Sequence, residues 1–419
     1  MSVDEVAPAL TPDYVPGLDL RAAATDGGER AQLVRRDANA LLARLLTHYE
    51  DKTTDQAADI MRMPVRDYLD DTLWQEELRA VHRQVPLPVA MSCELPRPGT
   101  YKAMDVIGVP VLITRDRDGV VHAMVNACRH RGSPVTELGT GTASRLTCPY
   151  HSWSYDLSGC LRGIYGEKTF GEVDRGARSL IPLPAEERAG IVFVGLRPGT
   201  SLDLDTWLGD LTPLLEGLGL ADLHHHSTME LPGPNWKVTL DGYLETYHFA
   251  SLHRGTVFKT NLSNMTAFDR WGPHQRNAAA LRGITDEALK PIELRDPAKG
   301  VGPNYFIFPA MAIAGGYRQH VAISIVLPGR TRTESVTQQI IGLRRPPADE
   351  EERRAADRTR DWFFEVVRDE DYAAQYAVDR GLTALDGTDL LFGRNEPGVQ
   401  HLHRAIRQHV ALLRDQRGE

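Results

Sequence analysis

Two short pairs of cysteine and histidine residues have the composition of a metal centre. Cys128 and His130 form the first pair, and Cys148 and His151 form the second, with seventeen residues between the pairs. Two thiolates and two imidazoles suit either an iron–sulfur cluster or zinc. A zinc finger usually holds both cysteines in one short pair and both histidines in the other. Here each pair has one residue of each kind, as a cluster requires when one iron binds both thiolates and the other iron binds both imidazoles. The spacing therefore favours a [2Fe–2S] cluster over zinc.

A second group of potential ligands lies in the C-terminal half. His248 and His253 are five residues apart in a segment, 237–253, whose apolar pattern predicts a helix. Side chains five apart on an ideal helix differ in direction by roughly 140°, so these imidazoles converge only if the helix ends or distorts between them. Two imidazoles and one carboxylate form the ligand set of a non-haem Fe(II) site, which leaves positions open for O2 and substrate. A structural role is the alternative for two isolated histidines.

The carboxylate of that set has to come from another part of the chain. We expect it to be Asp371, on a long charged helix predicted over 348–378. Asp369 and Glu370 are the rival ligands, and a solvated acidic helix face is the alternative explanation for all three carboxylates. The triplet of histidines at 224–226 also resembles a metal site, but neighbouring strand residues face opposite sides. We therefore interpret it as the start of a strand or as a linker.

The elements that must position these groups follow from hydrophobic periodicity. Further helices are predicted over 29–49, 72–82 and 398–414, and strands over 304–307, 320–326 and 335–343. Short β-branched runs between 85 and 196, with a hairpin over Asp118 and Gly119, predict a small antiparallel β domain that carries both Cys/His pairs on loops. The expected fold class is α+β. Residues 1–75 would be an N-terminal helical arm that is irregular over 1–27, 76–215 the β domain, and 216–419 a larger domain in which long helices cover an antiparallel sheet.

Composition excludes several other classes of protein. The chain has 419 residues, 42% of them hydrophobic and 25% charged, which is ordinary for a globular protein of about two domains. The formal net charge of −9 makes it a poor candidate for nucleic-acid binding. We find no secretory signal pattern and no run near the roughly 18 apolar residues of a membrane span. With four cysteines, of which Cys93 and Cys160 are expected to be free thiols, these features predict a cytoplasmic protein.

Together these motifs resemble the α subunit of Rieske non-haem iron oxygenases, the aromatic-ring-hydroxylating family. The matching features are Asn235-Trp236-Lys237 at the start of the predicted helix, the pattern Glu245-x2-His248-x4-His253, and the Glu370-Asp371 pair before Gly381-Leu382. The similarity extends from about Trp74 to near the C-terminus. It implies a β Rieske domain followed by a helix-grip type catalytic domain.

The resemblance implies a role for each candidate residue. Cys128 and Cys148 would bind one iron of a Rieske [2Fe–2S] cluster, and His130 and His151 the other. The mononuclear Fe(II) would have the ligands His248, His253 and Asp371. Family members are trimers, some with a small β subunit, in which the cluster of one subunit faces the mononuclear iron of the next. Glu245 would bridge the two centres by bonding His248 and His151 of the neighbouring subunit. Many ring-dihydroxylating members have Asp there, whereas Glu is similar to relatives that act on quaternary amines.

The expected function is O2 activation with electrons from NAD(P)H, delivered by a separate ferredoxin or flavin reductase, because the chain has no convincing nucleotide motif. The substrate would be an aromatic or similarly apolar compound that becomes hydroxylated. Alternatives are oxidative N- or O-demethylation, including quaternary-amine monooxygenation, a Rieske electron carrier with an inactive second domain, and a zinc-binding scaffold. Two further sets of residues are candidates for binding the electron donor and the substrate. Four arginines near the cluster could form a basic patch for an acidic electron donor (Arg129, Arg131, Arg145 and Arg162), and eight apolar residues are candidates to line the pocket (Leu240, Tyr247, Phe249, Phe258, Tyr305, Phe306, Phe308 and Met311).

Overall fold

The chain folds into antiparallel sheets and helices, and a computed structural model describes residues 28–418. This confirms the α+β class. The irregular arm expected over 1–27 lies outside the described residues. The strands are β1 (Met61–Pro64), β2 (Leu87–Met91), β3 (Thr100–Val106), β4 (Val109–Arg115), β5 (Val121–Val125), β6 (Gly139–Thr142), β7 (Leu146–Thr147), β8 (Ser154–Tyr155), β9 (Leu161–Gly163), β10 (Pro182–Leu183), β11 (Ala185–Arg188), β12 (Ile191–Val194), β13 (His224–Gly233), β14 (Asn261–Trp271), β15 (His274–Leu281), β16 (Val301–Ile307), β17 (Met311–Ala314), β18 (His320–Pro328), β19 (Ser335–Leu343) and β20 (Asp389–Phe392). The helices are α1 (Glu29–Asp51), α2 (Arg66–Leu69), α3 (Asp71–Glu77), α4 (Glu167–Phe170), α5 (Leu204–Leu208), α6 (Thr212–Gly217), α7 (Trp236–Tyr243), α8 (Phe249–Leu252), α9 (Ile284–Ala288), α10 (Pro297–Gly300), α11 (Glu350–Val366), α12 (Ala373–Leu382) and α13 (Pro397–Arg417).

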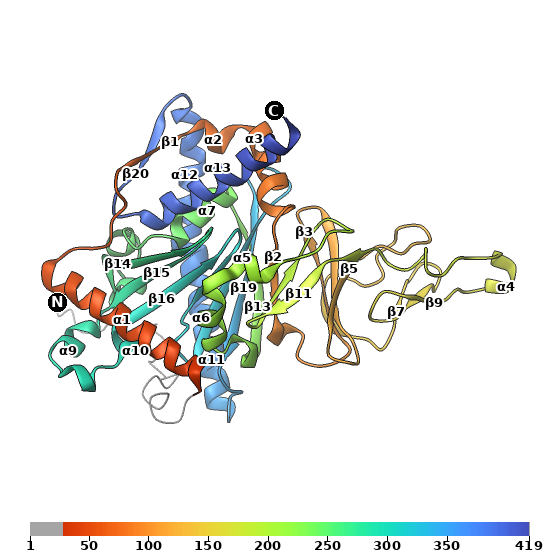
Figure 1. The fold of residues 1–419 in the computed structure, drawn as a ribbon, viewed down its shortest axis with the longest axis horizontal. Helices are drawn as coiled ribbons and strands as arrows, with labels where there is room; N and C mark the ends of the chain where they lie inside the picture. The colour runs from red at the N-terminus through yellow and green to blue at the C-terminus, as the bar shows by residue number, and fades with distance from the viewer. Residues whose placement is uncertain (1–27, 419) are drawn as a thin grey trace, which may run out of the picture.

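Three small sheets form one end of the molecule (Figure 1). Their strand orders are β10-β5-β4-β3-β6, β11-β12-β2 and β7-β8-β9, all antiparallel. The predicted hairpin is present as β4 and β5, whose turn contains Gly119 at φ 82°. Because β7 and β9 lie toward the outer part of this end, of which α4 forms the tip, the loops around them are far from the large sheet.

The rest of the chain surrounds one seven-stranded antiparallel sheet of order β13-β19-β18-β17-β16-β15-β14. Residues 224–226 begin its first strand, as expected. Alternate residues of β15 point to opposite faces. Arg276 reaches Asp37 on α1, with Nη2 3.0 Å from Oδ1, so α1 covers one face. The neighbouring Asn277 points to the other face, which α7 and α11 cover.

A buried ion pair of the small end lies against the large sheet. Lys102 on β3 lies 2.8 Å from Glu94, and both side chains are almost fully buried. Lys102 also donates to Gln338 on β19 at 2.9 Å. Separating the two parts would expose this ion pair and break the bond to Gln338, so the contact favours one fixed arrangement.

Two observations bear on the expectations about cysteines and membranes. All four cysteines are free, with Cys93 buried and Cys160 exposed. Between residues 28 and 418 there is no helix with the length and apolar character needed to span a bilayer.

Candidate metal centres and substrate pocket

The two Cys/His loops share one backbone design. In the first loop, the backbone of Cys128 accepts a hydrogen bond from Gly132 N at 2.8 Å and donates to Ser133 O at 2.8 Å. In the second, the backbone of Cys148 accepts from Ser152 N at 3.0 Å and donates to Trp153 O at 2.8 Å. Gly132 and Ser152 both have positive φ, 82° and 56°. Each loop therefore turns tightly four residues after its cysteine.

These loops bring two thiols and two imidazoles together. Cys128 and Cys148 are 3% and 2% exposed. The rings of His130 and His151 have centroids 4.7 Å apart, and His130 stacks on Trp153. Within the described part of the chain, His130 Nδ1 is buried and has no hydrogen-bond partner. A buried ring nitrogen without a partner, beside a second imidazole and two buried thiols, fits a [2Fe–2S] cluster.

The surroundings of the two loops affect the charge of the candidate ligands His130 and Cys128. Burial, and then the nearby His151, lower the pKa of His130. Burial raises the pKa of the Cys128 thiol, and the Tyr155 hydroxyl lies 3.3 Å from its sulfur. A hydrogen bond from Tyr155 to a thiolate would stabilise the negative charge that an iron ligand carries.

The second centre lies where two helices are interrupted. The predicted continuous helix over 237–253 is wrong, because α7 ends at Tyr243 and α8 begins at Phe249. The Glu245 carboxylate accepts hydrogen bonds from the backbone N–H groups of Tyr247 and His248, the latter at 3.2 Å. This side chain therefore provides partners for backbone groups that a continuous helix would have used.

The helix predicted over 348–378 is also interrupted. The helical run extends from Glu350 to Leu382, but 367–372 is a π-helical turn between α11 and α12. π-helical turns recur at functional sites because they redirect side chains. Here the turn carries both Glu370 and Asp371.

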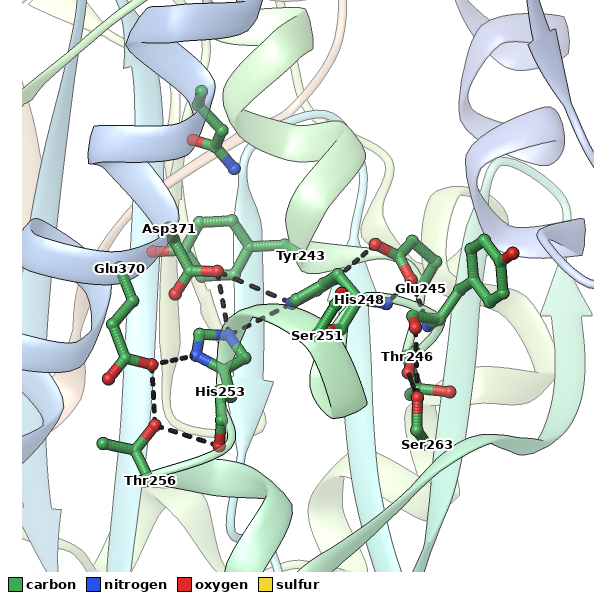
Figure 2. A network of polar contacts seen from close by, with 12 residues as sticks. Tyr243, Glu245, Thr246, His248, Ser251, His253, Thr256, Ser263, Glu370 and Asp371 are labelled. Atoms are coloured by element: carbon green, nitrogen blue, oxygen red, sulfur yellow. Dashed lines mark hydrogen bonds and ion pairs between the residues drawn. The ribbon is translucent and has the colours of Figure 1, made fainter.

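His248, His253 and Asp371 converge on one point (Figure 2). The distance from His248 Nε2 to His253 Nε2 is 3.1 Å, and Asp371 Oδ1 lies 3.1 Å from His253 Nε2 and 3.6 Å from His248 Nε2. Ligand atoms about 2.1 Å from one ion and about 90° apart lie about 3.0 Å from each other. The spacing therefore fits one face of an octahedral metal site, which leaves the opposite positions open.

Each histidine has its own carboxylate behind it. Glu245 contacts His248 Nδ1 and Glu370 contacts His253 Nδ1. Such contacts fix the ring orientation and direct both Nε2 atoms toward the point where the three side chains converge. Burial lowers the pKa of His253, but Asp371 and Glu370 outweigh burial, so its pKa is raised.

Sequence reasoning missed the role of Glu370, which it treated only as a rival ligand. Glu370 also accepts from the Thr256 hydroxyl at 2.7 Å, which holds it behind His253. Asp369, the other rival, is exposed and pairs with Arg368. The position of Glu370 directly before the ligand candidate was the available signal.

A slot of about 280 Å³ opens beside the three converging side chains. Small residues of β15 to β18 form its floor, and residues of α11 form its roof, including Thr359, Trp362 and Phe363. On this helical run the lining residues extend from Thr359 past Asp371. The floor residues are Ala279, Gly302, Ala312, Ala314 and Ala322.

Only Phe249 among the eight predicted pocket residues lines this slot. Leu240, Tyr305, Phe306, Phe308 and Met311 are buried in the hydrophobic core, Tyr247 is 61% exposed, and Phe258 packs under the guanidinium of Arg282. Large apolar residues fill space, whereas a cavity forms where small ones leave room.

The four arginines expected to form a basic patch differ in their contacts. Arg162 forms an ion pair with Asp156 at 2.6 Å, which offsets its charge. Arg131 lies over the exposed ring of Tyr150. Arg129 is half-buried and Arg145 is exposed. Arg131 and Arg145 are therefore the better candidates for a contact with an acidic protein.

Two family models match these two parts of the chain. The Rieske [2Fe–2S] domain matches residues 85–173, and the ring hydroxylating alpha subunit catalytic domain matches residues 220–412. The chain belongs to the Rieske oxygenase α-subunit family. As a member, it is an oxidoreductase that carries a Rieske [2Fe–2S] cluster and a mononuclear iron, and its electrons come from a reductase.

Curated relatives narrow the comparison within the family. The carnitine monooxygenase oxygenase subunit of Escherichia coli K12 is 26% identical over 359 residues, which are 83% of this chain and 93% of the relative. The glycine betaine monooxygenase oxygenase subunit of Chromohalobacter salexigens is 30% identical over 208 residues, 48% of this chain and 46% of the relative.

Solved structures share the fold. A quaternary ammonium Rieske monooxygenase in complex with L-carnitine has a TM-score of 0.71 at 21% identity, covering 88% of this chain and 98% of that chain. Naphthalene 1,2-dioxygenase with indole bound in its active site has a TM-score of 0.66 at 17% identity, covering 85% of this chain and 93% of that chain.

Proposed function

We propose that Cys128 and Cys148 bind one iron of the cluster, and His130 and His151 the other. His248, His253 and Asp371 bind the mononuclear iron. The convergence of three ligand atoms within 4.8 Å supports the second assignment. When bound, the cluster supplies single electrons and the mononuclear iron supplies open positions for O2 and substrate.

The remaining residues of the site hold and orient these ligands. Glu245 and Glu370 accept from the histidine Nδ1 atoms and keep the Nε2 atoms directed at the iron. We also propose that Glu245 contacts a cluster histidine, His151, of a second copy of the chain. The proposed assembly is a homotrimer, to which a small β subunit could add. Sedimentation analysis of the purified protein tests the assembly; a monomer at micromolar concentration would contradict it.

The reaction that we propose is hydroxylation of an aromatic or similarly apolar compound. The observation that supports it is the slot, whose floor is formed largely by alanine and glycine and whose roof holds Trp362 and Phe363. Such a lining favours binding of apolar surface and excludes bulk water from the iron. The test is turnover with a reductase and NADH on a panel of arenes, phenols and aromatic acids, with products identified by mass spectrometry under 18O2. Incorporation of 18O into an arene or alkyl group is expected.

Quaternary-amine oxidation is the second candidate. Glu245 favours it, because the resemblance associates Glu at this position with relatives that act on quaternary amines. Tyr243, Phe249 and Trp362 line the slot and could surround a trimethylammonium group. Carnitine and glycine betaine belong in the same panel. Hydroxylation of an N-methyl group would release formaldehyde and leave a dimethylamino compound, whereas hydroxylation of the N-methylene carbon would release trimethylamine and leave an aldehyde. Turnover of these compounds without turnover of any arene would replace the first candidate by the second.

A further inference from the structure

A pair of asparagines interrupts the apolar floor of the slot. Asn277 on β15 and Asn304 on β16 are direct cross-strand partners, and both line the slot. Side chains at such positions lie about 5 Å apart on the same face. The other slot-lining residues of these two strands are apolar, so the two amides are the polar exception on β15 and β16 (Ala279, Leu281, Val301, Gly302 and Pro303).

The orientation of the Asn304 amide is fixed by its partner. Its Nδ2 donates to the carbonyl oxygen of Tyr243 at 2.8 Å. A carbonyl oxygen only accepts, so the nitrogen must face Tyr243 and the oxygen must face away. Among residues 28–418, Asn304 Oδ1 is buried and has no hydrogen-bond partner.

Asn277 presents the opposite kind of group. It is 4% exposed, and its Nδ2 has no hydrogen-bond partner in the described chain. The start of α13 makes room for this amide at Gly398, where a Cβ would lie 2.6 Å from Asn277 Nδ2. The pair therefore offers one donor and one acceptor, both buried and both without partners among residues 28–418.

The pair lies close to the candidate iron site. Asn304 contacts the backbone of Tyr243, and the ring of Tyr243 lies beside Asp371 (Figure 2). Both asparagines line the slot, so a ligand bound there would supply the partners that buried polar atoms normally have.

We propose that Asn277 and Asn304 bind a neutral hydroxyl group of the substrate, so that the preferred substrates are phenols or alcohols with an apolar body. A hydroxyl accepts from Asn277 and donates to Asn304 at the same time. A carboxylate only accepts, and a trimethylammonium group offers neither a donor nor an acceptor. The inference rests on the proposed hydroxylation function and defines its substrate class.

The test measures binding without turnover. The iron-loaded full-length protein is dialysed to equilibrium under argon, without reductase, against 4-ethylphenol or 4-ethyltoluene. The wild type should bind 4-ethylphenol more tightly than 4-ethyltoluene. We measure this preference as the Kd for 4-ethyltoluene divided by the Kd for 4-ethylphenol, and we expect the Asn277→Leu variant to lower this ratio about fivefold. An unchanged ratio, or no binding of either probe to the wild type, would overturn the inference.

Gln275→Leu is the matched control. Gln275 is a buried amide on the same strand that does not line the slot, and both of its polar side-chain atoms have no partner within the described residues. Its replacement should leave the ratio unchanged; an equal fall in both variants would indicate a general disturbance of β15 and overturn the inference.

A third probe needs no variant. 4-Ethylanisole has an ether oxygen that can accept a hydrogen bond from Asn277, but it has no O–H group to donate to Asn304. It is also more apolar than 4-ethylphenol. We expect weaker binding of the anisole to the wild type, and equal or tighter binding would contradict the proposal. Selective binding without turnover would count against the hydroxylation function alone. Turnover together with unselective binding would count against the asparagine pair alone.

Discussion

The Nε2 atoms of His248 and His253 lie 3.1 Å apart although the residues are five positions apart. An uninterrupted helix would direct the two rings roughly 140° apart. The rings meet because α7 ends at Tyr243 and His248 lies just before α8. The interruption of the helix is thus what brings the two imidazoles together with Asp371.

Replacing His253 by alanine should remove the mononuclear iron and leave the cluster. His253 is 2% exposed and supplies one of the three converging atoms, so two ligands would remain. Iron analysis should show the loss, while the visible spectrum of the cluster persists and turnover disappears. His225→Ala is the control, because His225 lies on the surface and contacts Thr228. Retained turnover in His253→Ala would show that His253 is not a ligand.

Replacing Glu370 by glutamine should weaken mononuclear iron binding about 10- to 100-fold. The reason is that a neutral amide would no longer hold His253 with a charged acceptor. Competition with a chelator measures the affinity. The adjacent Asp369→Asn is a close control, because Asp369 is exposed and pairs with Arg368, away from both histidines. Equal iron affinity in both variants would remove Glu370 from the site.

Replacing Glu245 by glutamine should leave both metals in place and slow electron transfer between them. His248 would keep a hydrogen-bonding neighbour, but the negative charge proposed to link it to the second copy would be absent. Oxidation of the reduced cluster in a single turnover, followed by stopped-flow absorbance, reports this step. Glu351→Gln, on the first turn of α11, is the control. A normal rate in Glu245→Gln would reject the bridging role.

The protein should lose stability in mild acid through His82. This side chain is fully buried against Trp236, and burial lowers its pKa to about 3. Between about pH 6.5 and about 3 the unfolded chain binds a proton at His82 that the folded chain does not. The free energy of unfolding therefore falls with falling pH, by up to about 1.4 kcal/mol per unit for this group. The free energy of unfolding can be measured by urea titration between about pH 7.5 and 5, a window that covers the titration of histidine in the unfolded chain. It should fall less steeply with falling pH in His82→Phe than in the wild type, and an identical pH dependence would contradict the assignment.

The sequence was most informative where ligands lie close together in the chain. Cys128 with His130, and Cys148 with His151, each occupy a single loop, so their spacing alone predicts a cluster. The hairpin of β4 and β5 was predicted from a local turn. Asp371 was harder to select, because it lies far from His253 in the sequence and beside two other carboxylates, Asp369 and Glu370.

Side-chain interactions with the backbone were harder to predict. The end of α7 depends on which N–H groups the Glu245 carboxylate binds. Hydrophobic periodicity gives no information about such hydrogen bonds between a side chain and the backbone. The pocket was mispredicted for another reason: Ala312, Ala314 and Ala322 give no strong signal, whereas Phe306 and Met311 do. Only the strand register shows that the small residues share one face.

The small floor residues have a consequence for the evolution of specificity. Ala314 on β17 lies directly opposite Ala322 on β18. Leucine at either position would place a barrier across the slot without touching an iron ligand. A single substitution could therefore shorten the longest accepted substrate, so related enzymes can acquire different substrate ranges while their metal chemistry stays the same.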